Sequence, residues 1–141
     1  MSSGTSGDLM TWTGQFGPFI VGLALIGVAV LAWSGRWRGW AASPKAPFAM
    51  TTRNVIPFTL GLFGVAALFL GLSWNVAAGV VPGASAPWDI AAGVFAVLAW
   101  VSTLWWPAAL TPSWYQDWVH RGGNEQTDPW PSPRARSKGH R

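Results

Sequence analysis

The chain contains no cysteine, few charged residues and no long strand-like alternation of polar and apolar residues. The absence of cysteine excludes disulfides, thiolate metal sites and cysteine nucleophiles. Only 10% of the 141 residues are charged, against about a quarter in an ordinary soluble domain. A soluble fold would therefore have too few polar side chains to cover its surface. Half of the residues are apolar, which favours an all-α integral membrane protein.

Three long apolar runs predict three transmembrane helices, at residues 16–33, 55–74 and 88–106. Together they form a transmembrane domain at residues 16–106, which follows an external N-terminal segment at residues 1–15. The only ionisable group in these runs is a carboxylate in the first turn of the third, Asp89. At that place a carboxylate favours the positive end of the helix dipole.

Two prolines, Pro18 and Pro57, fall in the first turns of the first two predicted spans, where a helix tolerates proline. Deeper in the spans the polar side chains are hydroxyls, as at Thr59 and Ser102, which can bond to their own helix. Carriers, pumps and voltage sensors need ionisable groups at membrane depth. The sequence therefore argues against a carrier or pump that acts alone.

The basic residues predict the orientation of the chain, because cytoplasmic loops retain an excess of Lys and Arg. They fall in two blocks that three spans would place on the same side, which predicts an N-terminus outside and a C-terminus inside. The segments predicted outside carry Asp8 and no basic residue. These topology determinants are Arg36, Arg38, Lys45 and Arg53 in the first block, and Arg121, Arg134, Arg136, Lys138 and Arg141 in the second.

A short C-terminal helix is predicted within residues 107–122, with Thr111 as the N-cap, Pro112 as the first helical residue and Gly122 at its end.

Leu110, Trp114 and Trp118 recur every four residues in this segment, which is typical of an amphipathic helix lying in the inner membrane interface. The following segment, residues 123–141, is polar, basic and rich in proline. This composition predicts a disordered cytoplasmic tail.

Tryptophan is abundant, with 12 residues, and most of them fall at the ends of the predicted spans. An indole joins an apolar body to one N–H donor, so these positions predict anchors at the membrane interface. Trp100 is the exception, because it lies inside a span and is a candidate contact for a lipid, quinone or pigment. The predicted anchors are Trp12, Trp33, Trp37, Trp40, Trp74, Trp88, Trp105, Trp106, Trp114 and Trp118.

Small residues within the spans are candidates for helix packing, because they let helix backbones approach closely. Packing among the three helices of one chain and packing against a second chain both fit this pattern. The candidates are Gly22, Gly27, Gly61, Gly64, Ala67, Gly71, Ala92 and Ala96.

Residues suited to catalysis or metal binding are sparse. His120 and His140 are far apart in sequence, and Asp117 three residues before His120 indicates a surface ion pair rather than a catalytic dyad. No nucleotide-binding or hydrolase fingerprint is present. We therefore expect no enzyme, no cofactor and no metal site. The basic residues flank apolar runs, so they favour anionic lipid headgroups over nucleic acid.

The composition, rich in Ala, Gly, Trp and Arg, is similar to that of small membrane proteins of high-GC bacteria. The sequence thus favours a multi-pass protein of a bacterial cytoplasmic membrane, acting as a non-enzymatic accessory or scaffold subunit with a membrane-protein partner or a homo-oligomer. Two alternatives stay open. One is a self-associating, membrane-permeabilising protein similar to a phage holin, and the other is a lipid-handling enzyme or carrier.

Overall fold

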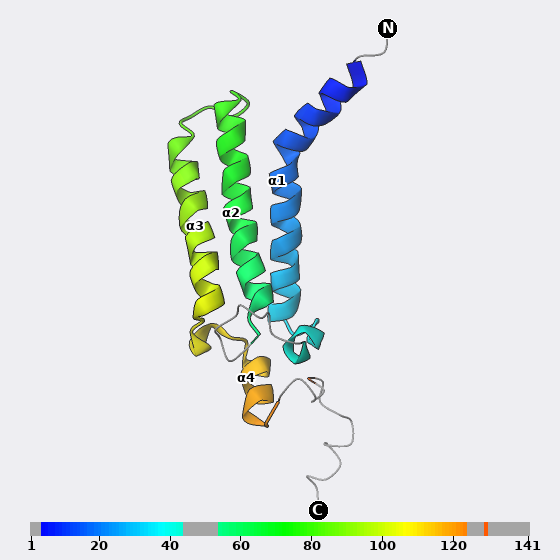
Figure 1. Ribbon diagram of the computed structural model, residues 1–141, viewed down its shortest axis with the longest axis vertical. Coiled ribbons are helices and arrows are strands. Elements are labelled where there is room, and N and C mark those ends of the chain that lie inside the picture. The colour runs from blue at the N-terminus through cyan, green and yellow to red at the C-terminus, as the bar shows by residue number, and fades with distance from the viewer. Residues whose placement is uncertain (1–3, 44–53, 124–128, 130–141) are drawn as a thin grey trace, which may run out of the picture.

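The computed structural model describes residues 4–43, 54–123 and 129, with side chains from Thr13 onward except that of residue 108. All regular structure in these ranges is helical, as the sequence predicts, and Figure 1 shows its arrangement. The elements are α1 (Gly4–Trp33), the 3-10 helix η1 (Gly39–Ala42), α2 (Ile56–Ala77), α3 (Ala86–Leu104), the 3-10 helix η2 (Ala108–Leu110) and α4 (Ser113–His120).

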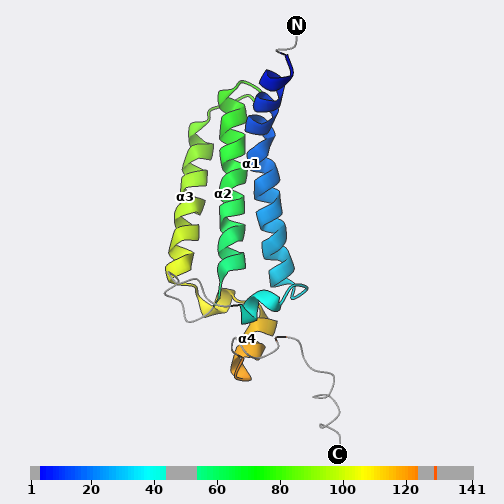
Figure 2. The ribbon, with the colours of Figure 1, turned by 45° about the vertical axis from the view of Figure 1, so that its right-hand side comes forward.

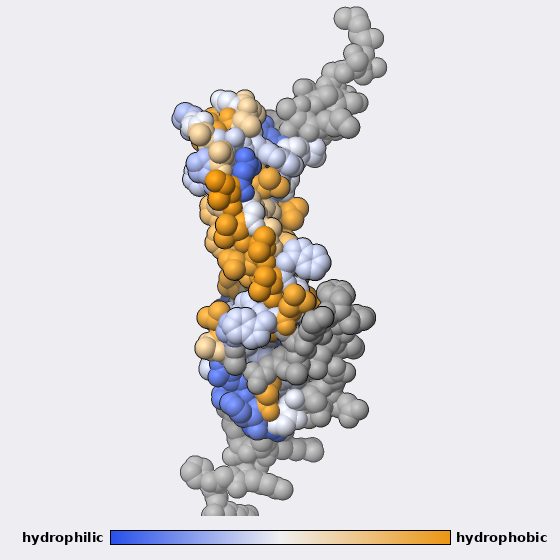
Figure 3. Space-filling view, turned by 60° about the vertical axis from the view of Figure 1, so that its left-hand side comes forward, coloured by the Kyte–Doolittle hydropathy of each residue, from blue (hydrophilic) through white to orange (hydrophobic). Residues whose placement is uncertain are grey.

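Three of these helices are long and apolar enough to cross a membrane: the Thr13–Trp33 part of α1, all of α2 and all of α3. They confirm a long apolar helix at each of the three predicted spans, although the bounds differ. Helix α1 begins well before the predicted span, α2 continues to Ala77, and α3 ends at Leu104, before the two adjacent tryptophans. A face on the α3 side has an apolar middle between more hydrophilic ends (Figure 3).

The three long helices form a single row with α2 in the middle (Figures 1 and 2). Helix α2 packs along both neighbours, whereas the described parts of α1 and α3 have no comparable contact with each other. Accordingly, 39% of the most apolar window of α2 is buried, against 11% for α1 and 17% for α3. The row therefore leaves most of the surface of its two outer helices uncovered.

The contact between α1 and α2 depends on glycine at its closest point. A Cβ atom placed on Gly22 would lie 2.8 Å from the Gly64 carbonyl oxygen, and one on Gly64 would lie 2.7 Å from the Gly22 oxygen. One turn further along, a Cβ on Gly61 would lie 2.6 Å from the Ala29 Cβ. These separations are below van der Waals contact, so the two backbones can cross here only where side chains are absent.

Pro18 lies inside α1 and not in its first turn, because the helix begins at Gly4. Proline lacks an N–H and its ring clashes with the preceding turn, which kinks a helix and frees carbonyl groups. Asn75 of α2 supplies a donor here: its side-chain N–H groups bond the Gln15 carbonyl at 3.2 Å and the Gly71 carbonyl at 2.8 Å. Beyond this point the N-terminal part of α1 leans away from α2 (Figure 1).

Helices α2 and α3 are joined by one hydroxyl pair near one end and one hydroxyl–carboxylate pair near the other. Thr59 and Ser102, both buried, have their hydroxyl oxygens 2.9 Å apart. The buried Ser73 donates to an Asp89 carboxylate oxygen at 2.5 Å. Between these pairs, Phe69 of α2 stacks on two rings of α3. The carboxylate expected only to start a helix therefore also joins two helices.

Helix α4 begins one residue later than the sequence predicts. Pro112 is the N-cap and Ser113 the first helical residue, with no side-chain cap, while Leu110 belongs to η2. Tyr115 and Trp118 are buried against the chain itself. The apolar side of α4 therefore packs mainly on the protein, whereas the sequence predicts that it faces lipid. This difference has a physical reason, because indoles bury as well against other rings as against acyl chains.

Candidate functional site

Seven of the described aromatic side chains pack together at one end of the molecule, where α1 ends and α4 lies. We call this group the aromatic cluster: Trp33, Trp40, Phe58, Trp106, Trp114, Tyr115 and Trp118. It draws on α1, η1, α2, α4 and the segment after α3, so it joins parts of the chain that are distant in sequence.

Trp40 is the centre of the cluster. Its ring stacks on Tyr115 with centroids 5.1 Å apart, and it meets the edges or faces of Phe58 at 5.2 Å and Trp114 at 5.6 Å. The Asn54 side chain donates to the Trp40 carbonyl at 2.8 Å, and its own oxygen accepts from the Ile56 N–H at 3.2 Å. Asn54 thereby fixes η1 against the start of α2.

The cluster also contains buried donors without acceptors. Within the described residues, the indole N–H groups of Trp40, Trp106 and Trp118 are buried and form no hydrogen bond. A buried unpaired donor costs about 1–3 kcal/mol, so ring packing in the cluster must outweigh these losses. Bulk and shape, rather than hydrogen bonding, hold these three rings.

The turn that follows α1 is tightly hydrogen bonded. Gly35 has a φ of 72°, a left-handed conformation that glycine adopts without strain. The Arg38 Nε donates to the Gly35 carbonyl at 3.0 Å, and the Arg38 guanidinium lies over the Trp114 ring, 5.0 Å from its centroid. The Trp114 N–H in turn donates to the Trp33 carbonyl at 3.2 Å. These contacts fasten α4 to the end of α1.

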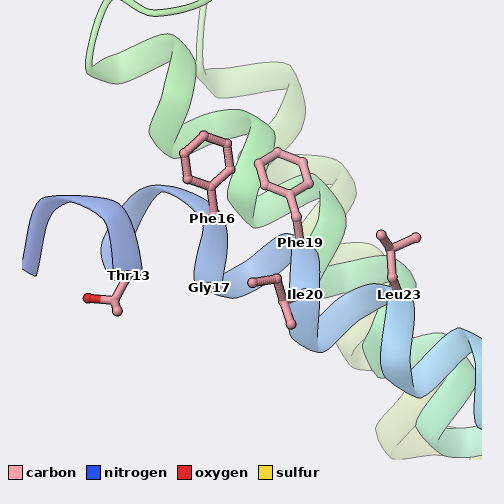
Figure 4. A pocket seen from close by; sticks show the side chains of 6 residues that line it. All are labelled: Thr13, Phe16, Gly17, Phe19, Ile20 and Leu23. Atoms are coloured by element: carbon pink, nitrogen blue, oxygen red, sulfur yellow. The ribbon is translucent and has the colours of Figure 1, made fainter. Parts of the chain in front are cut away.

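An apolar hollow of about 510 Å³ lies on α1 beside the Pro18 kink. All of its lining residues belong to α1, and Figure 4 shows their side chains. Only Thr13 contributes a polar side chain. The lining residues are Thr13, Phe16, Gly17, Phe19, Ile20 and Leu23.

The structure divides the tryptophans predicted to be interface anchors into two groups. Trp40 and Trp118 are buried in the aromatic cluster, and Trp106 and Trp114 are half-buried beside them, so these four differ from freely exposed anchors. The side chain of Trp12 lies outside the described residues. The exposed members of the set are Trp33, Trp37, Trp74, Trp88 and Trp105.

Trp100 of α3 is 65% exposed, although it lies within an apolar helix. Its neighbours on the helix surface include Val97 and Leu104, which are also exposed. The ring of Trp100 is therefore largely uncovered by the described side chains, and no described residue accepts a hydrogen bond from the Trp100 indole.

Only some of the small residues predicted to pack helices lie against a neighbouring helix. Gly22, Gly61, Gly64 and Gly71 all face a neighbouring helix, and a Cβ on Gly71 would contact Phe19 and Pro18 of α1. A Cβ placed on Gly27 would have no atom within 4 Å. Ala92 is buried, and Ala67 and Ala96 are half-buried.

Of the basic residues, Arg36, Arg38 and Arg121 are described, and all lie at the end that holds the aromatic cluster. The remaining six fall outside the described residues, as does His140, together with nearly all of the predicted tail at 123–141. These six are Lys45, Arg53, Arg134, Arg136, Lys138 and Arg141.

The described residues offer little for catalysis. They contain no group of three His, Asp or Glu side chains that could hold a metal ion. Asp117 and His120 are exposed on α4, and within the described chain no hydrogen bond or ion pair joins them.

Sequence reasoning missed two polar side chains that organise this fold, Asn54 and Asn75. Each binds a backbone carbonyl of another segment. A signal for Asn75 does exist in the sequence, because a proline inside a membrane helix frees carbonyls that a neighbouring helix must satisfy.

No protein-family model, no curated protein and no solved structure matches the chain.

Proposed function

We propose that this protein is a non-enzymatic accessory or scaffold subunit of a bacterial cytoplasmic membrane, holding a partner membrane protein against its row of helices. The observation that carries the proposal is the uneven packing of the row. Only α2 is enclosed on both sides, while α1 and α3 keep most of their apolar surface exposed. Gly27 of α1 and Gly93 of α3 lie uncovered on these helices, and small residues of this kind let a partner helix approach closely.

The orientation belongs to the same proposal, with the N-terminus outside and the end that holds the aromatic cluster facing the cytoplasm. The arginines of the described chain support it, because Arg36, Arg38 and Arg121 lie at that end. Asp89, at the opposite end, has no arginine beside it among the described residues. The bacterial origin rests on composition.

The experiment is purification of the tagged protein from its native membrane in a mild detergent, followed by mass spectrometry of what remains bound. A stoichiometric companion is expected. Isolation of the protein alone would refute the scaffold function. Isolation as a homo-oligomer without companions would favour the membrane-permeabilising alternative, which conductance measurements in liposomes would then test.

Two matched variants locate the contact. Gly93 on α3 and Gly27 on α1 both have open space around the missing side chain, so a leucine at either place should leave the isolated chain intact. Loss of the companion from Gly93→Leu but not from Gly27→Leu would place the partner on α3. The reverse result would place it on α1, and retention by both variants would contradict docking on these faces.

A further inference from the structure

The end of the molecule that holds the aromatic cluster carries an excess of positive charge. Its described charged side chains are Arg36, Arg38 and Arg121, against the single carboxylate of Asp117. The arginines lie directly beyond the apolar part of α1 and at the end of α4. In a bilayer this is the level of the lipid headgroups, where anionic groups are concentrated.

Capping of α1 does not explain the presence of Arg36. A helix leaves its last four carbonyl groups without intrahelical partners, and a nearby cation often satisfies them. Here every one of those carbonyls already accepts a hydrogen bond: Val30 from the Ser34 N–H, Leu31 from the Trp37 N–H and the Ser34 hydroxyl, Ala32 from the Gly35 N–H, and Trp33 from the Trp114 indole.

The two arginines of this turn differ in what they contact. Arg38 is half-buried, held by its bond to the Gly35 carbonyl and by the Trp114 ring. Arg36 is exposed, and within the described chain it forms no hydrogen bond or ion pair. The turn therefore holds one guanidinium as a structural element and presents the other to its surroundings.

Exposed indoles flank Arg36 on both sides in the sequence. Trp33 is 49% exposed and Trp37 is 45% exposed, and the backbone N–H of Trp37 is fixed by the Leu31 carbonyl at 3.1 Å. An indole places its apolar body among acyl chains and its N–H among headgroup oxygens. A guanidinium is the side chain best suited to bind a phosphate through two parallel hydrogen bonds.

We propose that the turn from Trp33 to Arg38 is a binding site for an anionic phospholipid, with Arg36 as the ligand of the headgroup phosphate. The indoles of Trp33 and Trp37 lie beside the glycerol and the upper acyl chains. A lipid, rather than a soluble phosphate, is the occupant because Trp33 ends the apolar helix and positions the turn at the bilayer surface. This inference needs no protein partner, so it can fail or succeed independently of the scaffold function.

The test uses the purified full-length protein in zwitterionic micelles, titrated with phosphatidylglycerol or with phosphatidylcholine of the same acyl chains. Native mass spectrometry measures the bound lipid. We expect the protein to prefer phosphatidylglycerol, and Arg36→Gln to weaken that binding about tenfold or more, because it removes charge-assisted hydrogen bonds to the phosphate. Binding of phosphatidylcholine should weaken less, because its choline cation offsets the charge of its phosphate.

The matched control is Arg121→Gln, which removes the same charge from an exposed position at the same end of the molecule. It should leave phosphatidylglycerol binding near that of the unmodified protein. Arg36→Lys keeps the charge but not the forked geometry, and it should bind with intermediate affinity. This variant also serves if Arg36→Gln does not fold.

Equal losses from Arg36→Gln and Arg121→Gln would overturn the proposal, because they would indicate diffuse attraction to net charge. Absence of a preference for phosphatidylglycerol would overturn it as well. Displacement of the lipid by glycerol 1-phosphate at the same concentration would show that a soluble phosphate suffices, and would refute the lipid assignment.

Discussion

The crossing of α1 and α2 at Gly22 and Gly64 yields the sharpest prediction about stability. In Gly64→Ala the new Cβ would lie 2.7 Å from the Gly22 carbonyl oxygen, 2.9 Å from the Ile26 Cγ1 and 3.0 Å from the Leu25 Cβ. Two of these three atoms are a backbone oxygen and a Cβ, which cannot rotate away, so the helices must separate. Overpacking of this kind costs about 1–3 kcal/mol.

The assay is reversible unfolding of the purified protein in mixed micelles, with increasing SDS as denaturant and circular dichroism as the signal. Gly27→Ala is the control, since a Cβ there meets no atom within 4 Å. We expect Gly64→Ala to unfold at clearly lower SDS than Gly27→Ala. Combining Gly64→Ala with Gly22→Ala should cost less than the sum of the two, because both changes act on one contact. Equal stability of Gly64→Ala and Gly27→Ala would refute the close crossing.

Three further predictions follow from other contacts. The Ser102 hydroxyl hydrogen goes to the Ala99 carbonyl, so Thr59 must be the donor in its bond to Ser102. Thr59→Val should therefore lower stability in the same assay by about 0.6 kcal/mol. No change would show that the hydroxyl pair contributes nothing to stability. Trp118→Phe removes an unpaired buried donor and should cost much less than Trp118→Ala, for which about 3–5 kcal/mol is expected; similar thermal stabilities would contradict this. In the cysteine-free chain, Ala84→Cys should react with an impermeant maleimide added outside intact cells and Ser43→Cys only after lysis; the opposite pattern would reverse the proposed orientation.

The three apolar helices could be predicted because hydropathy and length are local properties of the sequence. The start of α1 could not, since Gly4 to Gln15 contains glycine, serine and threonine, which are weak helix formers. That error also placed Pro18 in a first turn. Its consequence, the bond from Asn75 to the Gln15 carbonyl, depends on which helix lies beside the kink.

For the side chains of the candidate sites, too, the local sequence does not reveal which neighbours they contact. Composition identifies glycine and alanine as packing residues, but only the order of helices in the row decides that Gly64 meets Gly22 while Gly27 faces open space. Likewise, tryptophans near a span end look alike in sequence. Trp37 is exposed and Trp40 is buried because η1 folds back over the start of α2, a tertiary event that periodicity does not report.

The two ends of the row are held by different kinds of interaction, and this difference explains how α4 is ordered. A helix of eight residues is too short to be stable by itself in water. It is held by its buried Tyr115 and Trp118, by the indole bond from Trp114 to the end of α1, and by the Arg38 guanidinium. At the other end, Ser73 bonds a carboxylate of α3 and Asn75 bonds a carbonyl of α1, and each bond joins α2 to one neighbour. The aromatic end therefore forms one packed unit, and hydrogen bonds join the turn that carries Arg36 to that unit.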